Sequence, residues 1–190
     1  MVLLSLVLAK ENSSDSDLID SYIEQIAVGD TEALGLLYHH TKASVYSYAL
    51  SVMKDTHDAE DILHDCYVKL YSAAKDYISQ GKPMAWIITI TKNLCLKRLK
   101  EKKNFTDETE LDPEKELEFS ADVSEDDRIL IRECLRKLSD DERRIVVLHA
   151  VSGFLHREIA EFMNIPLSTV ISKYNRAIAK LEKSFMGGKV

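Results

Sequence analysis

The sequence has little glycine, proline or cysteine, with six, three and three of these residues in 190. Cys66, Cys95 and Cys134 are odd in number and far apart, with no CxxC pair, so neither a disulfide framework nor a zinc site is expected. The six histidines show no HxxxH spacing, and we expect no metal and no cofactor. The scarcity of turn residues, together with the lack of recurring alternating β-branched runs, predicts an all-α protein.

Long hydrophobic runs and catalytic motifs are also missing. The apolar run from Val2 to Ala9 is too short to span a bilayer and lacks the basic region of a secretory signal. We therefore expect no membrane association, and the few, widely spaced cysteines fit a reducing cytoplasm. Neither a GxxxxGK loop nor a nucleophile elbow occurs in the chain, which predicts that the protein is not an enzyme.

Charge is distributed unevenly along the chain, whose net charge is −7. The segment from Asn104 to Asp127 contains eleven acidic residues and one base, so it alone carries −10. The same segment holds Pro113 and has weak hydrophobic periodicity, which predicts a flexible acidic linker at 104–123. The fold class expected is therefore two small helical domains joined by this linker.

Four helices are expected before the linker. Their apolar residues recur at helical spacing, with Asp30 and Thr56 as the expected N-caps of the second and third helices. In the fourth, the β-branched run from Ile87 to Thr91 favours a strand, but the spacing of Trp86, Ile90 and Leu94 favours a helix, which we adopt. The predicted ranges are 16–28, 31–53, 58–77 and 83–103.

The C-terminal stretch 154–185 predicts a helix, a tight turn and a second helix. Asn164 suits the left-handed end of the first helix, and Pro166 suits the first turn of the second. Two more helices are expected before this pair, at about 125–138 and 140–152. Ser139 and Glu142 match a capping box that would open the latter helix.

A basic face on the last helix favours DNA binding. From Leu167 onward the chain has five basic residues and one acid, and a helix-turn-helix places its second helix in the major groove. Two amphipathic helices of an ordinary bundle would explain the apolar pattern equally well. The helix at 83–103 also ends in a basic stretch, which suits either a helix dipole or a nucleic-acid backbone. Asp61 and Asp65 form an acidic strip that is either a solvated face or a surface for a basic partner.

Three stretches in this order resemble the extracytoplasmic-function (ECF) group of the sigma-70 family, the smallest sigma factors of bacterial RNA polymerase. The first, AEDILHDCYVKLY at 59–71, is similar to the family's polymerase-binding helix. The second, AWIITITKNLCLKRLK at 85–100, resembles its helix for recognising and melting the minus-ten element. The third, at 138–181, resembles its minus-thirty-five domain.

The resemblance implies a division of labour among the residues. The polymerase would dock on four residues: Asp61, His64, Asp65 and Tyr67. The minus-ten DNA would meet five: Trp86, Lys92, Asn93, Lys97 and Arg98. The minus-thirty-five groove would be faced by five more: Ser168, Thr169, Ser172, Lys173 and Arg176.

The resemblance also implies a domain plan and partners. An N-terminal tail (1–15) would precede a region-2-like domain (16–103), the acidic linker (104–123), a region-4-like domain (124–186) and a short C-terminal tail (187–190). The expected partners are RNA polymerase core, promoter DNA and an anti-sigma factor that wraps both domains. Two other readings remain: a stand-alone helix-turn-helix regulator, and a helical module that binds only proteins.

Overall fold

A computed structural model describes residues 13–105 and 137–187 of the chain. These ranges contain seven α-helices, one short 3₁₀-helix and no strand, so the prediction of an all-α protein is confirmed. Residues 106–136, which include most of the predicted linker, most of the helix expected at 125–138 and Cys134, lie outside the described residues. No helix in the two described ranges combines the length and apolar content needed to span a bilayer.

The first two helices of the described residues pack against each other and are joined by a short turn. Helix α2 spans Ser13–Ala27, so it begins three residues before the predicted start. Gly29 adopts a φ of 98°, which ends this helix at little steric cost because glycine lacks a Cβ atom. Asp30 then caps helix α3, Thr31–Met53, and its carboxylate accepts hydrogen bonds from the amides of Glu32 and Ala33, as predicted.

Helices α4 and α5 complete the N-terminal half. Helix α4 spans Thr56–Ala73 and continues into a 3₁₀ turn, Ala74–Asp76. The prediction of Thr56 as N-cap is wrong by one residue: the carboxylate of Asp55 accepts from the amide of Asp58, and Thr56 is already helical. Helix α5 spans Pro83–Phe105, so the helical reading of its β-branched stretch is confirmed.

The C-terminal half contains the predicted helix-turn-helix. Helix α7, Asp140–Ala150, opens with the capping box of Ser139 and Glu142. Helix α8, His156–Met163, ends at Asn164, which has the left-handed φ of 54° that was expected. Helix α9, Leu167–Gly187, starts directly after Pro166, so this proline precedes the first turn and does not lie within it as predicted. Along α9, the buried Val170 and Ala177 confirm the predicted apolar face.

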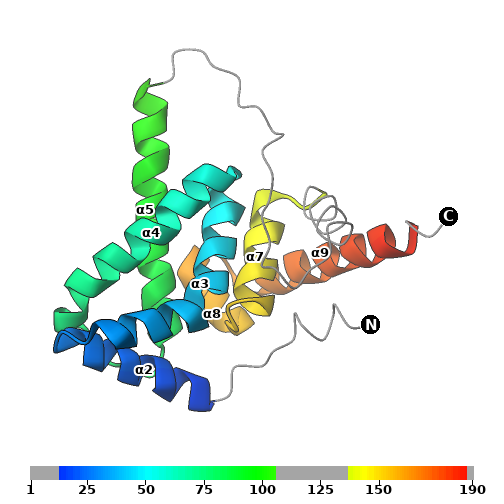
Figure 1. Cartoon of the computed structure of the whole chain (residues 1–190). Helices are drawn as coiled ribbons and strands as arrows, with labels where there is room; N and C mark the ends of the chain where they lie inside the picture. The colour runs from blue at the N-terminus through cyan, green and yellow to red at the C-terminus, as the bar shows by residue number, and fades with distance from the viewer. Residues whose placement is uncertain (1–12, 106–136, 188–190) are drawn as a thin grey trace.

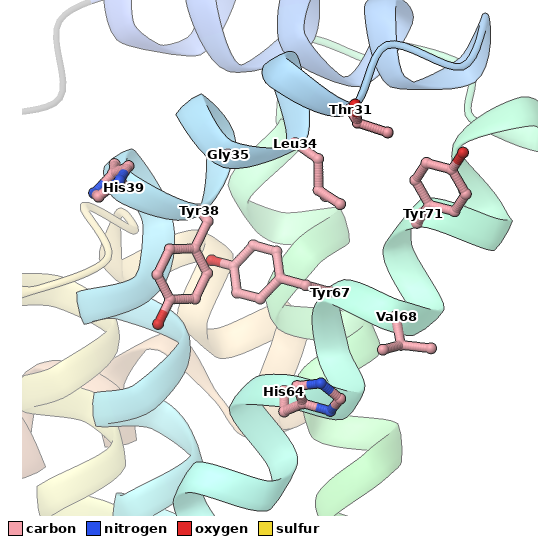
Figure 2. Close-up of a pocket in the computed structure, with 9 residues that line it drawn as sticks. All are labelled: Thr31, Leu34, Gly35, Tyr38, His39, His64, Tyr67, Val68 and Tyr71. Carbon is pink, nitrogen blue, oxygen red and sulfur yellow. The ribbon is translucent and has the colours of Figure 1, made fainter.

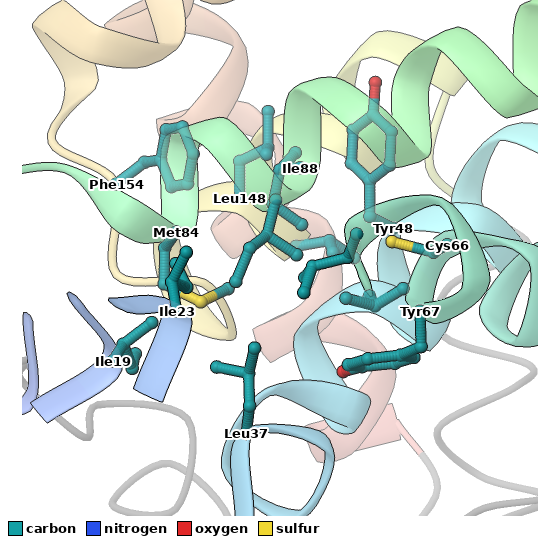
Figure 3. Packing of buried hydrophobic residues seen from close by; sticks show 14 of the residues in the cluster. Ile19, Ile23, Leu37, Tyr48, Cys66, Tyr67, Met84, Ile88, Leu148 and Phe154 are labelled. Carbon is teal, nitrogen blue, oxygen red and sulfur yellow. The ribbon is translucent and has the colours of Figure 1, made fainter. Parts of the chain in front are cut away.

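One continuous hydrophobic core joins the two halves (Figures 1 and 3). Ile23, Leu37 and Ile88 of the N-terminal half are fully buried in the same cluster as Leu148 and Phe154 of the C-terminal half. Figure 1 shows α7 lying alongside α3, with α9 extending from α7 on the side away from α3. Because the halves share a core, the helix-turn-helix packs against the N-terminal half in this structure.

Candidate functional site

The predicted polymerase-binding helix, α4, presents an exposed acidic strip. Asp61, His64 and Asp65 are all exposed, and the carboxylate of Asp65 lies 4.0 Å from the Nδ1 atom of His64. Spacings of three and four residues place these side chains on one side of the helix. The structure therefore brings three of the four predicted docking residues to a common surface.

Tyr67, the fourth residue, is placed differently. Its side chain is buried, and its hydroxyl lies 2.7 Å from the Thr41 hydroxyl inside the core. The ring packs edge-on against Tyr38 with the ring centres 4.9 Å apart. Burial raises the pKa of Tyr67 above its ordinary value, so this phenol stays protonated. A partner could reach Tyr67 through the groove beside it.

That groove lies between α3 and α4 and has a volume of about 640 Å³ (Figure 2). Apolar and aromatic groups dominate its lining, and Val68 and Tyr71 remain 59% and 42% exposed. The lining residues are Thr31, Leu34, Gly35, Tyr38, His39, His64, Tyr67, Val68 and Tyr71. An apolar groove next to an acidic strip suits a helix that carries both apolar and basic side chains.

Ion pairs connect α4 directly to α5. The guanidinium of Arg98 contacts the carboxylate of Asp61, and its Nε atom lies 3.5 Å from Asp58. Lys102, one turn further along α5, also contacts Asp58. We call these four residues, Asp58, Asp61, Arg98 and Lys102, the α4–α5 cluster. It joins a predicted polymerase-binding residue to a predicted minus-ten residue.

Sequence reasoning missed Asp58 as a member of this site. In the sequence it is an acid in the first turn of a helix, a position that the helix dipole favours, although its side chain is nearly buried at 10% exposure. The three-residue spacing of Asp58 and Asp61, and the four-residue spacing of Arg98 and Lys102, were visible in the sequence. Those spacings place each pair on one helix face but do not reveal that the two faces meet.

Of the other predicted minus-ten residues, two are exposed and two are packed against or hydrogen-bonded to other parts of the protein. Asn93 and Lys97 are exposed, and the ammonium of Lys97 lies 3.8 Å from Glu101 on the same helix. Trp86 is half-buried and packs against Tyr77 with the two rings tilted by 50° and their centres 4.5 Å apart. Lys92 donates a hydrogen bond to the backbone oxygen of Phe162 (2.8 Å).

On helix α9, the predicted minus-thirty-five residues also differ in exposure. Ser168, Ser172 and Arg176 are exposed, and Thr169 and Lys173 are half-buried. Three of these five side chains therefore face solvent on a helix that begins immediately after the tight turn. This is the position that a recognition helix requires.

Two basic residues of α9 are anchored to α7. The ammonium of Lys173 lies 2.8 Å from Asp141, and that of Lys180 lies 2.6 Å from the buried Glu142. The hydrogen bond from Lys180, aided by those from Ser139, lowers the pKa of Glu142 to about 2. Glu142 thus closes its capping box and fixes α9 at the same time.

Further contacts hold the helix-turn-helix against the N-terminal half. The Lys92 ammonium lies 4.4 Å from the centre of the Phe162 ring, in addition to its hydrogen bond there. Three more side chains of the N-terminal half reach α7, α8 or the loop between them: Lys54 to Asp140 (2.9 Å), Lys82 to Glu158 (2.8 Å) and Ser44 to the backbone oxygen of Val151 (3.1 Å).

Comparison with known families gives two matches in the expected order. The family model described as Sigma-70 region 2 matches residues 37–105. The model described as Sigma-70, region 4 matches residues 128–181. The first covers α5, most of α3 and all of α4, and the second covers the helix-turn-helix.

Curated relatives and solved structures agree with these matches. The chain is 25% identical over 173 residues to the ECF RNA polymerase sigma factor SigK of Mycobacterium ulcerans, covering 87% of this chain and 92% of the relative. SigK of Mycobacterium tuberculosis H37Rv matches with the same identity and coverage.

Two solved structures share the fold. The structure of CnrH in complex with the cytosolic domain of CnrY has a TM-score of 0.59 at 20% identity, covering 90% of this chain and 99% of that one. RpoE of Bartonella quintana, in complex with the anti-sigma factor NepR, has a TM-score of 0.61 at 18% identity, covering 80% and 96%. The chain belongs to the ECF group of the sigma-70 family of RNA polymerase sigma factors.

Proposed function

We propose that this chain binds RNA polymerase core and directs promoter-specific transcription initiation, using α4 for the polymerase and α5 and α9 for DNA. The observation that carries the assignment of surfaces is their arrangement on one molecule. An acidic strip and an apolar groove lie on α4, while basic side chains extend along α5 and α9. The helices that carry these surfaces, α4, α5 and α9, follow the order of the matched regions: α4 and α5 lie in region 2, and α9 lies in region 4.

The proposed polymerase contacts are Asp61, His64 and Asp65 on the strip, with Tyr67 reached through the groove. Exposed carboxylates attract a basic partner and guide its orientation. Burial of the apolar groove by the partner would stabilise the complex, because apolar surface is removed from water. This combination supports a docked helix with basic and apolar side chains, rather than a small-molecule ligand.

The proposed DNA contacts follow from exposure and charge. On α5, Asn93 and Lys97 are exposed, Arg98 is half-buried and paired with Asp58 and Asp61, and Lys92 becomes accessible when it leaves Phe162. We propose that Trp86, held in place by its packing against Tyr77, supports the melted strand. Opening DNA exposes bases whose unstacking costs a few kcal/mol per step, and protein contacts to the freed strand offset that cost.

On α9, we propose that Ser168, Thr169, Ser172, Lys173 and Arg176 face the major groove of the minus-thirty-five element. Hydroxyls, ammonium and guanidinium groups are the donors that bind phosphates and base edges. Lys173 would exchange its contact with Asp141 for a phosphate when DNA arrives.

Further parts of the proposal concern partners and setting. RpoE of Bartonella quintana was solved in complex with the anti-sigma factor NepR, which supports an anti-sigma factor as a third partner for this chain. We also propose that the protein works in the cytoplasm, where the polymerase is, and that it has no catalytic activity of its own.

Run-off transcription from a genomic fragment library tests the function directly. Core polymerase is assayed with and without the protein, and its housekeeping sigma factor serves as the positive control. We expect discrete new start sites that appear only with this protein. Absence of new transcripts from an active polymerase of the same host, combined with a promoter footprint by the free protein, would instead establish a stand-alone regulator.

A further inference from the structure

The α4–α5 cluster contains one inner and one outer carboxylate. The side chain of Asp58 is 10% exposed, whereas that of Asp61 is 62% exposed. Arg98, 34% exposed, contacts both of them, and Lys102 shares Asp58. The inner carboxylate is enclosed by two basic groups, and the outer one is open to any partner that approaches α4.

We infer that Asp61 competes with promoter DNA for Arg98, and that Asp58 is the positioning residue that keeps Arg98 in place during the exchange. Polymerase docking on Asp61 would thereby release Arg98 to the minus-ten strand. This inference rests on the proposed function, because it requires that Asp61 meets polymerase and that Arg98 meets DNA.

The competition follows from the chemistry of the guanidinium group. Its planar fork of N–H donors binds carboxylate and phosphate oxygens in the same way, so Asp61 and a DNA phosphate are alternative partners. While Asp61 contacts Arg98, it offsets the positive charge that DNA would meet. A basic group of the polymerase placed beside Asp61 would weaken that hold.

Asp58 explains why Arg98 would remain ordered after release. Its carboxylate is fixed in the first turn of α4, where its own amide is capped by Asp55. Lys102 approaches the same carboxylate from the next turn of α5. Arg98 would therefore keep its contact with Asp58 when DNA replaces Asp61, so binding DNA would cost little side-chain entropy.

The coupling must act in both directions. If polymerase strengthens DNA binding through Arg98, DNA must strengthen polymerase binding by the same factor. Ion pairs of this exposure are weak, so we expect an effect of about two- to fivefold.

The first experiment uses the full-length free protein. Fluorescence anisotropy measures its affinity for a labelled single strand carrying the minus-ten sequence identified by run-off transcription. Asp61→Asn should bind about two- to fivefold more tightly than wild type. Glu60→Gln removes one charge at an adjacent exposed position of α4 and serves as the control. Equal gains in both variants, or no gain in Asp61→Asn, would overturn the inference.

The second experiment repeats the measurement with RNA polymerase core. Arg98→Gln should lose more affinity in the holoenzyme than in the free protein, because Arg98 is released only when polymerase is bound. Lys97→Gln removes a neighbouring cation that forms an ion pair with Glu101 on its own helix, and this variant should lose the same factor in both states. Equal behaviour of the two variants would contradict the inference.

The same data separate this inference from the proposed function. Wild-type protein that binds neither polymerase nor the minus-ten strand would overturn the proposed function. Normal binding of both, with no difference between Arg98→Gln and Lys97→Gln, would overturn the coupling alone. Asp58→Asn adds a check on positioning: DNA binding by the holoenzyme should weaken while binding of polymerase itself is retained.

Discussion

A covalent link between α3 and α7 should block initiation at promoters that need both DNA elements. Minus-ten and minus-thirty-five elements are about 25 base pairs apart, or roughly 85 Å along B-form DNA. In the structure, Lys92 touches Phe162, so a path from Lys97 through this contact to Arg176 covers no more than about 50 Å. The two proposed DNA-binding surfaces must therefore separate before both elements are bound.

Lys54→Cys and Asp140→Cys place thiols where an exposed interdomain ion pair now lies. A short cleavable dimaleimide would join them, after Cys134 is replaced by Ser, while Cys66 and Cys95 are buried and react slowly. Burial also raises the pKa of Cys66 to about 11 and that of Cys95 to about 12, which keeps both thiols protonated.

The assay is run-off transcription from a promoter that depends on both elements. We expect the crosslinked protein to initiate at least tenfold more slowly, equivalent to losing about 1.4 kcal/mol of minus-thirty-five contacts. Cleaving the linker should restore the rate, and the unlinked double variant is the control. Undiminished initiation by fully crosslinked protein would refute the reasoning, because it would mean that the closed arrangement already serves both elements.

Three further changes test individual contacts. Glu142→Gln should lower the free energy of unfolding by about 1–2 kcal/mol at pH 7, because the contact with Lys180 and the capping box weaken. Since the native pKa is lowered from 4.5 to about 2, this loss should be constant above pH 4.5 and shrink as the pH falls toward 2 in urea titrations. Tyr67→Phe should lower stability by about 1 kcal/mol, seen as a lower Tm, through loss of one buried hydrogen bond. Lys173→Ala combined with Arg176→Ala should weaken footprints over the minus-thirty-five element and reduce the salt-dependence slope by about two; an unchanged slope would place these side chains away from phosphates.

Local patterns predicted the helices well because their signals lie within a few residues. The capping box of Ser139 and Glu142, the Asp30 cap and the left-handed Asn164 were all read from neighbouring residues, and all are present. The cap of α4 was misplaced by one residue because Asp55 and Thr56 both favour that position. Boundaries depend on such small differences in free energy, whereas the existence of a helix does not.

Contacts between distant segments could not be predicted in this way. The partner of Lys92 is a backbone oxygen 70 residues away, and no side-chain pattern marks that atom. Likewise, Asp58 has the sequence signature of any acid in a first helical turn, and its enclosure by Arg98 and Lys102 depends on how α4 packs against α5. Exposure of the acidic strip on α4 was predictable from spacing, but the burial of Tyr67 was not.

Lys54 holds a left-handed backbone conformation, with a φ of 60°, at the end of α3. Glycine would adopt this conformation with less strain, yet it could not reach Asp140. Low backbone strain and contact between the two halves therefore favour different side chains at this position. A Lys54→Gly chain would have less backbone strain at the end of α3, but it would lose the ion pair that joins the two halves. Selection for a stable helix end and selection for contact between the halves would therefore favour different residues at position 54.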